Sequence, residues 1–224
     1  CYSDYLVNVT QDITNRVKNK FQLYKDKFIT IHNGFDKDDL LGLDFKKTEV
    51  TNKIKVIYAG SLGLGRIKAI EMIMDFLLEC DSRRLDSFEF NFFTPYDEKK
   101  LDKKYCNLLN KIVFFHRPIS PKKILLEMCK HEYCLSINSP IYPYAFGTKI
   151  FDYMLLNKKI IHISDGGELH SLMKTLGQIS INYNKNQLST VFNNLNTSNN
   201  QNIINYSEFN IEELLKQYEA LIND

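Results

Sequence analysis

A glycine-rich segment at residues 60–66, Gly-Ser-Leu-Gly-Leu-Gly-Arg, has the composition of an anion-binding turn. Glycines let the backbone approach a ligand closely, and a following helix directs its first N–H groups at that ligand. The spacing matches neither the dinucleotide fingerprint nor the P-loop, and the next predicted strand ends at Thr94 without an acidic residue. NAD binding therefore has little support. Glycines in an ordinary strand-to-helix turn are the structural alternative.

Two basic side chains are placed where they could bind a diphosphate. A helix N-terminus stabilises an exposed anion by only about 0.3–1 kcal/mol, whereas a charge-assisted hydrogen bond contributes roughly 1.5–3 kcal/mol. Arg66 stands at the start of one predicted helix and Lys149 at the start of another. Asp152 lies three residues after Lys149, shares its helix face and could accept hydrogen bonds from ribose hydroxyls. The alternative for these last two residues is an ordinary surface ion pair.

These side chains belong to a regular alternation of strands and helices. Apolar, β-rich runs predict strands at residues 28–32, 54–59, 88–94, 112–115, 133–137 and 159–163. Helices are predicted at 11–25, after the glycine-rich turn, at 96–109, from Ser120-Pro121, at 148–156 and after Asn210. Five strand-helix alternations predict an α/β fold, a Rossmann-like parallel sheet with helices on both faces.

The ends of the predicted strands locate the candidate site. In an open parallel sheet, ligands bind beyond the carboxyl ends of the strands, where loops and helix N-termini converge. Four loops are predicted there, at residues 60–66, 94–97, 116–121 and 138–149. The site is expected among these four loops.

Composition favours a folded domain and excludes several classes of function. The 224 residues are 44% hydrophobic and 25% charged, which supplies enough apolar side chain for a core. Basic residues exceed acidic ones by 29 − 27 = +2, so no nucleic-acid partner is predicted and any anion site is local. No run approaches the roughly 18 apolar residues of a membrane span. Five cysteines without a Cys-x-x-Cys pair predict thiols in a reducing compartment.

The remaining ionisable residues carry no obvious chemistry. The five histidines have no metal-ligand spacing with cysteine or aspartate, so each is predicted to be a surface or hydrogen-bonded histidine, and no metal is predicted. The segment 165–168, Asp-Gly-Gly-Glu, resembles a turn that caps the next helix. Its acids are therefore predicted to be helix-dipole partners.

Three segments occur together in an order that resembles a known family. They are residues 31–36 (Ile-His-Asn-Gly-Phe-Asp), 56–62 (Val-Ile-Tyr-Ala-Gly-Ser-Leu) and 147–161, which opens Gly-Thr-Lys-Ile-Phe-Asp-Tyr-Met. The chain resembles the C-terminal, donor-binding half of the two-domain retaining GT-B glycosyltransferases of family 4. The resemblance extends over residues 4–224. It implies hexosyl transfer from a nucleotide-diphospho-sugar to a glycan or lipid-linked acceptor.

The resemblance also implies roles for single residues. Arg66 and Lys149 match the catalytic cations that hold the diphosphate and stabilise its developing charge. Asp152 matches the carboxylate on the ribose, where Glu is usual, and the base packs against the loop at 116–119. No metal and no cofactor beyond the donor substrate are implied. The predicted donor-binding set is completed by Gly60, Ser61, Gly63, Arg117, Ile119, Tyr144, Ala145, Phe146, Gly147 and Thr148.

One position departs from the pattern of the family. Many members carry a Glu eight residues before the ribose carboxylate, near the donor sugar, and here that position is Tyr144. The loop at 142–147 is still expected to meet the sugar, through backbone N–H groups. Two alternatives are kept: a nucleotide-sugar epimerase, which shares the two-domain architecture, and a catalytically inactive nucleotide-binding or scaffold domain, which Tyr144 and the missing domain suggest.

The resemblance divides the chain into three parts. Residues 1–27 are expected to be the last strand and helix of an acceptor domain, residues 28–205 the nucleotide-sugar-binding Rossmann-like domain, and residues 206–224 a closing helix. The chain begins in mid-pattern, so we expect a piece of a longer protein with little transfer activity alone, because one wall of the cleft is missing. The expected location is cytoplasmic, or the inner face of the membrane with peripheral association of the parent protein.

Overall fold

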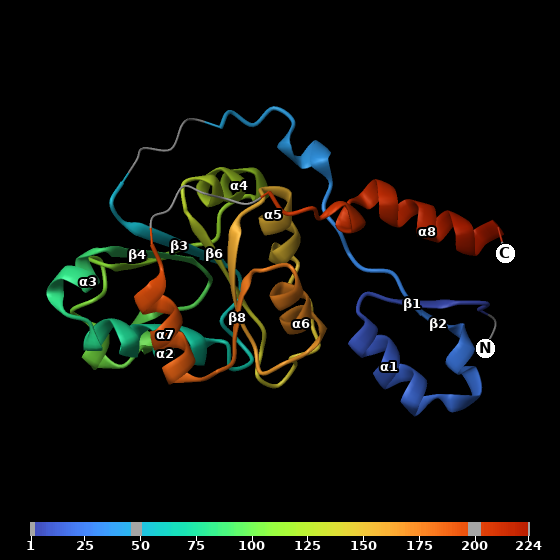
Figure 1. The fold of residues 1–224 in the computed structure, drawn as a ribbon, viewed down its shortest axis with the longest axis horizontal. Helices are drawn as coiled ribbons and strands as arrows, with labels where there is room; N and C mark the ends of the chain where they lie inside the picture. Colours follow the sequence, from blue (N-terminus) through green and yellow to red (C-terminus); the bar gives the residue numbers. More distant parts are fainter. Residues whose placement is uncertain (1–2, 46–50, 197–202, 224) are drawn as a thin grey trace.

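The computed structural model describes residues 3–45, 51–196 and 203–223, and its strands form two parallel sheets (Figure 1). In the smaller sheet, β1 (Leu6–Asn8) pairs with β2 (Phe28–Thr30), and the two are joined by α1 (Gln11–Lys20) and a 3₁₀ helix (Gln22–Lys27). We call residues 3–30 the amino-terminal unit. The larger sheet has the order β5-β4-β3-β6-β7-β8. Its strands are β3 (Ile54–Ala59), β4 (Phe88–Phe93), β5 (Val113–His116), β6 (Tyr133–Ile137), β7 (Lys159–Ile163) and β8 (Ile179–Ile181).

Helices cover both faces of the six-stranded sheet, as predicted. Successive side chains of a strand point to opposite faces, and β3 accordingly serves two cores. Val56 and Tyr58 pack with α2 (Ile67–Glu79) and α7 (Lys185–Asn194), whereas Ile57 and Ala59 pack on the other side. The helices of that second face are α4 (Pro121–Cys129), α5 (Lys149–Leu155) and α6 (Glu168–Thr175). A short helix, α3 (Ser82–Asp86), precedes β4.

The strand order reverses beside β3. The chain moves from β3 outward to β4 and β5, and then returns through α4 to place β6 against the other side of β3. β7 and β8 continue in that second direction. A reversal of this kind is a topological switch point, where the loops after the two central strands diverge and leave room for a ligand.

One predicted helix is absent and another is shorter than expected. The prediction of a helix at 96–109 is wrong, and the segment contains two 3₁₀ turns, Glu98–Lys100 and Lys103–Tyr105. Asp97 and Asp102 each accept a hydrogen bond from a backbone N–H two residues later, at 3.1 and 2.9 Å, and such local bonds compete with helix formation. The helix predicted at 11–25 ends at Lys20.

Two elements were missed in the carboxyl-terminal part. The edge strand β8 is only three residues long, and α7 lies in the asparagine-rich stretch where no element was predicted. Asn184 caps α7 by accepting the N–H of Gln187 at 3.0 Å. Leu188 and Phe192, four residues apart, bury the inner face of the helix. Part of that stretch, 197–202, lies outside the described residues.

The strand predicted at 28–32 belongs to the smaller sheet. Because β2 pairs with β1, the domain boundary placed between residues 27 and 28 separates β2 from its partner strand, and the division into domains stays a prediction. The chain then crosses between the sheets beside residues 209–211. There Phe35 N donates to Phe209 O at 2.9 Å and Ile211 N donates to Phe35 O at 3.0 Å. The closing helix predicted after Asn210 is α8 (Ile211–Asn223).

Packing, not backbone conformation, explains the glycine at position 34. An Asn-Gly pair such as Asn33-Gly34 is typical of a tight turn with positive φ, but Gly34 does not have positive φ. A Cβ atom at this position would instead clash with the carbonyl oxygen of Phe209. Gly34 thus permits the close approach of the two chain segments that cross between the sheets. None of the described helices is long and apolar enough to cross a bilayer.

Candidate functional site

The structure places the two predicted cations on either side of the switch point. Arg66 follows β3 and immediately precedes α2, and Lys149 is the first residue of α5, in the connection that follows β6. β3 and β6 are neighbouring strands, so their loops meet. The Ser139 hydroxyl donates to the carbonyl oxygen of Leu64 at 2.6 Å. The loops at 60–66 and 138–149 therefore form one surface at the carboxyl edge of the sheet.

The glycine-rich turn is partly explained by backbone geometry. Gly65 has a φ of 82°, which glycine adopts without strain, and an added Cβ would lie 3.1 Å from the Cγ atom of Pro140. Gly63 has no such requirement, since only the hydroxyl of Ser61 lies near, at 3.4 Å from an added Cβ. The requirements of an ordinary strand-to-helix turn thus explain the glycine at position 65 but not the one at position 63. Gly63 is exposed, so a ligand can reach its backbone.

Arg66 presents a positive charge among neutral hydroxyls. Its Nη1 atom donates to the carbonyl oxygen of Gly63 at 3.3 Å, and in the part of the chain that the structure describes it forms no ion pair with a carboxylate. Burial raises the pKa of Tyr58 to about 12 and raises the pKa of Tyr183 as well, while the Arg66 charge acts in the opposite direction on both. Both tyrosines stay neutral, and the guanidinium is available to an anion.

Lys149 and Asp152 share a helix face, as their spacing predicted. Lys149 Nζ lies 2.7 Å from Asp152 Oδ2, and the two side chains are 37% and 24% exposed. In this structure the two side chains therefore form the i,i+3 ion pair of the alternative interpretation. An exposed pair of this kind is worth only about 0–1 kcal/mol, so Lys149 can bind a second anion at little cost while Asp152 remains beside it.

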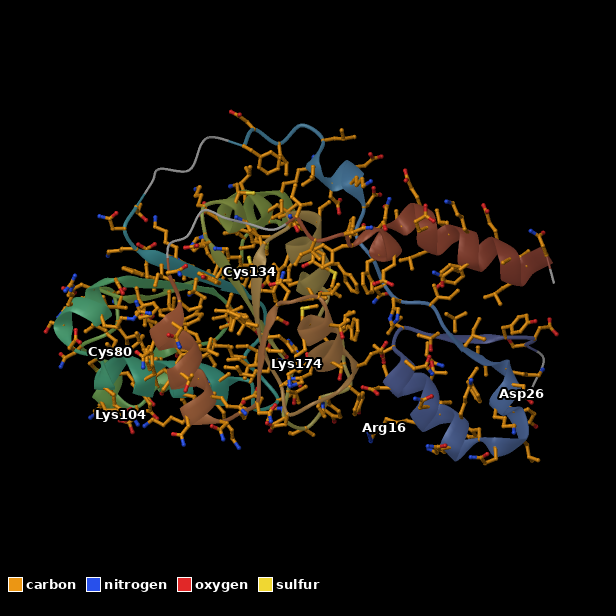
Figure 2. All side chains as sticks on the ribbon, in the orientation of Figure 1. Arg16, Asp26, Cys80, Lys104, Cys134 and Lys174 are labelled. Atoms are coloured by element: carbon orange, nitrogen blue, oxygen red, sulfur yellow. The ribbon has the colours of Figure 1, made fainter. Side chains whose placement is uncertain are left out.

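The loop at 142–147 lies against the amino-terminal unit. Thr10 donates its hydroxyl to the carbonyl oxygen of Tyr144 at 3.3 Å, and the Arg16 guanidinium lies 4.3 Å from the centre of the Tyr144 ring. Phe146 stacks on His32 with 5.4 Å between ring centres. Figure 2 shows Arg16 beside α1, on the side of this helix that faces the larger sheet. These partners were missed in the sequence, because no local pattern links residues 134 positions apart.

Backbone donors of the same loop are available to a ligand. Among the described residues, the N–H groups of Tyr144, Phe146 and Gly147 donate no hydrogen bond, and the N–H of Ala145 makes only a long one, 3.4 Å, to Tyr142 O. Asn138, at the start of the 138–149 connection, holds the loop in place by donating its side-chain amide to the carbonyl oxygen of Pro143 at 2.9 Å. The expected recognition through N–H groups stays a prediction.

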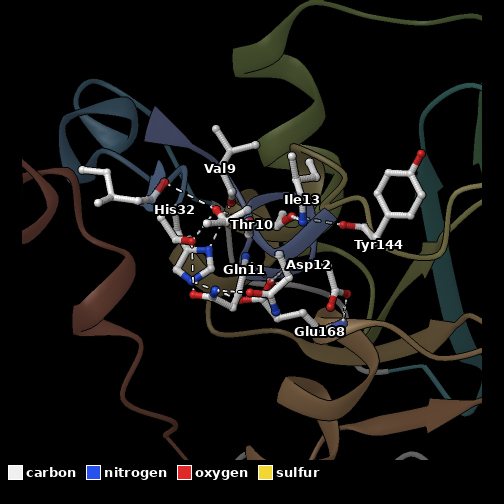
Figure 3. A network of polar contacts seen from close by, with 12 residues as sticks. Val9, Thr10, Gln11, Asp12, Ile13, His32, Tyr144 and Glu168 are labelled. Carbon is white, nitrogen blue, oxygen red and sulfur yellow. Dashed lines mark hydrogen bonds and ion pairs between the residues drawn. The ribbon is translucent and has the colours of Figure 1, made fainter. Parts of the chain in front are cut away.

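Helices α1 and α6 cap each other across the two sheets (Figure 3). Glu168 Oε2 accepts the N–H of Gln11 at 2.6 Å and that of Asp12 at 3.3 Å, at the start of α1. Asp12 Oδ2 in turn accepts the N–H of Glu168 at 2.7 Å, at the start of α6. His32 Nε2 lies 3.3 Å from Glu168 Oε1. Glu168 thus lies in the first turn of α6, as expected of a helix-dipole partner, and its carboxylate also caps the start of α1.

The loops after β4 and β5 enclose a hollow of about 590 Å³. Its walls include Thr94, Tyr96 and Arg117. Ile119 instead lines a neighbouring hollow of about 640 Å³, together with Phe93. The two residues of this loop that were predicted to contact the donor base therefore face different hollows.

Three of the histidines each make a hydrogen bond through one ring nitrogen, while the Nε2 atoms of His131 and His162 are buried without a partner among the described residues. His116 Nε2 lies 2.7 Å from Asn91 Oδ1 and His162 Nδ1 lies 3.0 Å from Ser136 Oγ. His131 bonds to a backbone carbonyl oxygen at 2.8 Å. Within residues 3–45, 51–196 and 203–223, no three His, Cys, Asp or Glu side chains gather as metal ligands. The absence of a metal stays a prediction.

Comparison with known proteins gives structural matches only. No family model and no curated protein sequence matches the chain. A glycosyltransferase from Rickettsia africae ESF-5 superimposes on 97% of the chain with a TM-score of 0.69 and 16% identity. The UDP-GlcNAc 2-epimerase from Methanocaldococcus jannaschii covers 99% with a TM-score of 0.57 and 14% identity. Sucrose-phosphate synthase from Thermosynechococcus elongatus covers 99% with a TM-score of 0.62 and 15% identity.

The likeness concerns the fold. The chain spans 62% of the length of the first two of these proteins and 58% of the third. At such identities only architecture is shared, and the architecture agrees with the prediction from the sequence. The chain has a Rossmann-like α/β fold, a parallel six-stranded sheet between two layers of helices, of the kind found in GT-B glycosyltransferases.

Proposed function

We propose that this chain is the donor-binding part of a retaining GT-B glycosyltransferase of family 4. The observation that carries the proposal is the position of Arg66 and Lys149, which flank the switch point between β3 and β6 on two loops that touch. Ligands of open α/β sheets bind at such points. Two cations there suit the diphosphate of a nucleotide sugar, because arginine and lysine both bind phosphate oxygens.

Each remaining group of the donor has a candidate partner. Asp152, next to Lys149, would accept hydrogen bonds from ribose hydroxyls, although Asp is one methylene shorter than the usual Glu. The base would enter the hollow beside Thr94 and Arg117. The sugar would lie against the free N–H groups of the loop at 142–147.

Transfer would proceed at the anomeric carbon. Its bond to the diphosphate oxygen breaks and leaves the electron pair on the diphosphate. A bond to the acceptor hydroxyl oxygen forms on the same face of the sugar, and the hydroxyl proton passes to the departing diphosphate. Arg66 and Lys149 stabilise the negative charge that gathers on the departing diphosphate, an effect that operates mainly in the transition state. The proposed reaction is hexosyl transfer to a glycan or lipid-linked acceptor, without metal or further cofactor, in the cytoplasm or at the inner face of the membrane.

A second candidate is an epimerase that acts on the donor alone. The observation in its favour is the structural likeness to a UDP-GlcNAc 2-epimerase. The replacement of the family's Glu by Tyr144 similarly favours a third candidate, a domain that binds nucleotides without catalysis. Incubation of the parent protein with a nucleotide sugar and no acceptor distinguishes the first two: appearance of an epimer identifies the epimerase.

Calorimetric titration of the chain with UDP, GDP, ADP and CDP tests the shared core of these proposals. We expect one diphosphate to bind, and Arg66→Ala and Lys149→Ala each to weaken binding roughly 10- to 100-fold, as the loss of a charge-assisted hydrogen bond predicts. Lys68→Ala removes the same charge from an exposed position of α2 and should leave the affinity unchanged. Equal losses of affinity in all three variants would mean that binding depends only on the net charge of the chain. An unchanged affinity for Arg66→Ala would contradict the proposal.

A further inference from the structure

The glycine-rich turn contains a leucine in a conformation that leucine rarely adopts. Leu64 has a φ of 55°, in the left-handed region, where the Cβ atom of an L-residue lies too close to the following carbonyl oxygen. The other non-glycine residues with positive φ in the described ranges are Asn110 and Asn157, and asparagine visits this region routinely. Leu64 is 54% exposed, so burial of its side chain does not explain the conformation.

Leu64 occupies the first central position of a tight turn. The N–H of Arg66 donates to the carbonyl oxygen of Gly63 at 3.2 Å, and both residues between them, Leu64 and Gly65, have positive φ. Positive φ at both central positions is the mark of a type I′ turn, in which glycine and asparagine are the usual residues. Glycine at position 65 meets this requirement, whereas leucine at position 64 does not. The turn is therefore strained at one residue.

A buried serine holds the strained residue. Ser139 is 1% exposed, and its hydroxyl donates to the carbonyl oxygen of Leu64 at 2.6 Å while it accepts the N–H of Ile141 at 3.1 Å. The carbonyl of Leu64 and the N–H of Gly65 belong to one planar trans peptide, so they point in opposite directions. By fixing the carbonyl, Ser139 therefore also sets the direction of the Gly65 N–H.

The turn, and not the helix that follows it, has N–H groups that an anion could use. The first N–H groups of α2 are already bonded, because those of Arg66, Ile67 and Lys68 donate at 3.1–3.2 Å to carbonyl oxygens within residues 62–65. In the part of the chain that the structure describes, the N–H groups of Leu64 and Gly65 donate no hydrogen bond. An anion in front of this segment would therefore bind the N–H groups of the turn.

We propose that Ser139 is a positioning residue of the candidate diphosphate site. Its hydroxyl holds Leu64 in the left-handed conformation and so keeps the turn in the shape that presents the Gly65 N–H to an anion. The same shape positions Arg66, because the carbonyl oxygen of Gly63 accepts hydrogen bonds from its N–H at 3.2 Å and from its Nη1 atom at 3.3 Å. This role rests on the proposed function, since the anion is taken to be the diphosphate of the donor. Strained residues persist where surrounding contacts hold them, and they cluster at functional sites.

Calorimetric titration of the full chain with inorganic pyrophosphate, the group that the candidate donors share, tests this role. Ser139→Ala frees Leu64 to leave the left-handed region, and a turn that keeps the binding shape about a tenth of the time binds roughly tenfold more weakly. Adding Leu64→Gly to this variant should restore the affinity to within about threefold of the parent, because glycine adopts positive φ without strain. Adding Leu64→Ala should restore nothing, since alanine keeps the Cβ atom.

Two further measurements separate this role from a general effect on stability. Ser136→Ala is the matched control, because it removes another buried hydroxyl, 3.0 Å from His162 Nδ1 on β6 and β7, and it should bind pyrophosphate like the parent. Urea unfolding needs no ligand. Leu64→Gly should make the parent more stable than Leu64→Ala does, and this difference should shrink in Ser139→Ala, where the strain is already released.

Four results would overturn the inference. They are an unchanged affinity in Ser139→Ala, equal recovery from Leu64→Gly and Leu64→Ala, an equal loss in Ser136→Ala, and equal stability of the parent with Leu64→Gly or Leu64→Ala. A parent chain that binds pyrophosphate leaves the proposed function standing in each of these cases. Absence of pyrophosphate binding by the parent would instead contradict the diphosphate site itself, and with it the role of Ser139.

Discussion

Glu168 holds the amino-terminal unit against the larger sheet, and neutralising it should loosen that unit selectively. Glu168→Gln keeps an oxygen that can accept a hydrogen bond but removes the negative charge at the start of α1. It also removes the ion pair with His32, whose Nε2 lies 3.3 Å from Glu168 Oε1. The core around β3 and β4 does not include Glu168, so its stability should not change.

The size of the effect follows from these two contributions. A charge at a helix N-terminus is worth about 0.3–1 kcal/mol. The His32 pair, with side chains 28% and 22% exposed, adds about 0.2–1 kcal/mol. The sum is roughly 0.5–2 kcal/mol, which corresponds to about a 2- to 30-fold increase in the population of the open state. Glu168→Ala also removes the hydrogen bonds to Gln11 and Asp12 and should have a larger effect.

Native-state hydrogen exchange measures the opening of the amino-terminal unit at individual backbone amides. Amides of α1 and β2 should exchange about 2- to 30-fold faster in Glu168→Gln, while those of β3 keep their rates. Asp81→Asn is the matched control, because Asp81 caps α3 within one element by accepting the N–H of Arg84 at 2.8 Å. It should leave α1 unchanged. Unchanged exchange in α1 of Glu168→Gln, or equal acceleration in β3, would refute the role assigned to Glu168.

Three further predictions concern stability. Gly34→Ala should destabilise the chain by several kcal/mol in urea unfolding, because the new Cβ meets a backbone carbonyl oxygen. Gly167→Ala should do the same and also speed exchange in α1, since φ is 91° and another carbonyl fills the space. Burial lowers the pKa of His131 to about 4 and that of His162 to about 3, from 6.5 in the unfolded chain. The unfolded chain therefore binds more protons below pH 6.5, and each histidine should cost roughly 2 kcal/mol of stability between pH 7.5 and pH 5. In urea unfolding at the two pH values, His162→Gln should lose less stability than the parent.

The parts of the fold that the sequence predicts well are the buried strands. The strands at 54–59, 133–137 and 159–163 were predicted to the residue, because a central parallel strand is apolar on both faces and its run ends where burial ends. Where polar side chains decide the local conformation, the pattern fails. The side chains of Asp97 and Asp102 accept backbone hydrogen bonds of about 3 Å that stabilise two 3₁₀ turns in place of the predicted helix. The spacing of apolar residues does not reveal such hydrogen bonds.

For the candidate site, the sequence predicts which loops meet. Contact between the loops that carry Arg66 and Lys149 follows from one rule, that loops after adjacent parallel strands lie together. The contacts of Thr10, Arg16 and His32 with the loop at 142–147 follow from no such rule. They depend on how two separate sheets pack, and that packing is fixed by the reciprocal helix caps and the chain crossing near Phe35, neither of which leaves a periodic signal.

These contacts link the departure at position 144 to a neighbour outside the motif. The Tyr144 ring lies under the Arg16 guanidinium at 4.3 Å, an arrangement in which an aromatic face balances a cation without carrying charge. A glutamate in this place would pair with Arg16, and that pair would compete with hydrogen bonds from the carboxylate to a sugar. Tyrosine at 144 and arginine at 16 therefore form a consistent set. With the side chain engaged in this way, the N–H groups of Tyr144, Phe146 and Gly147, which donate no hydrogen bond among the described residues, are the donors that the loop offers to a ligand.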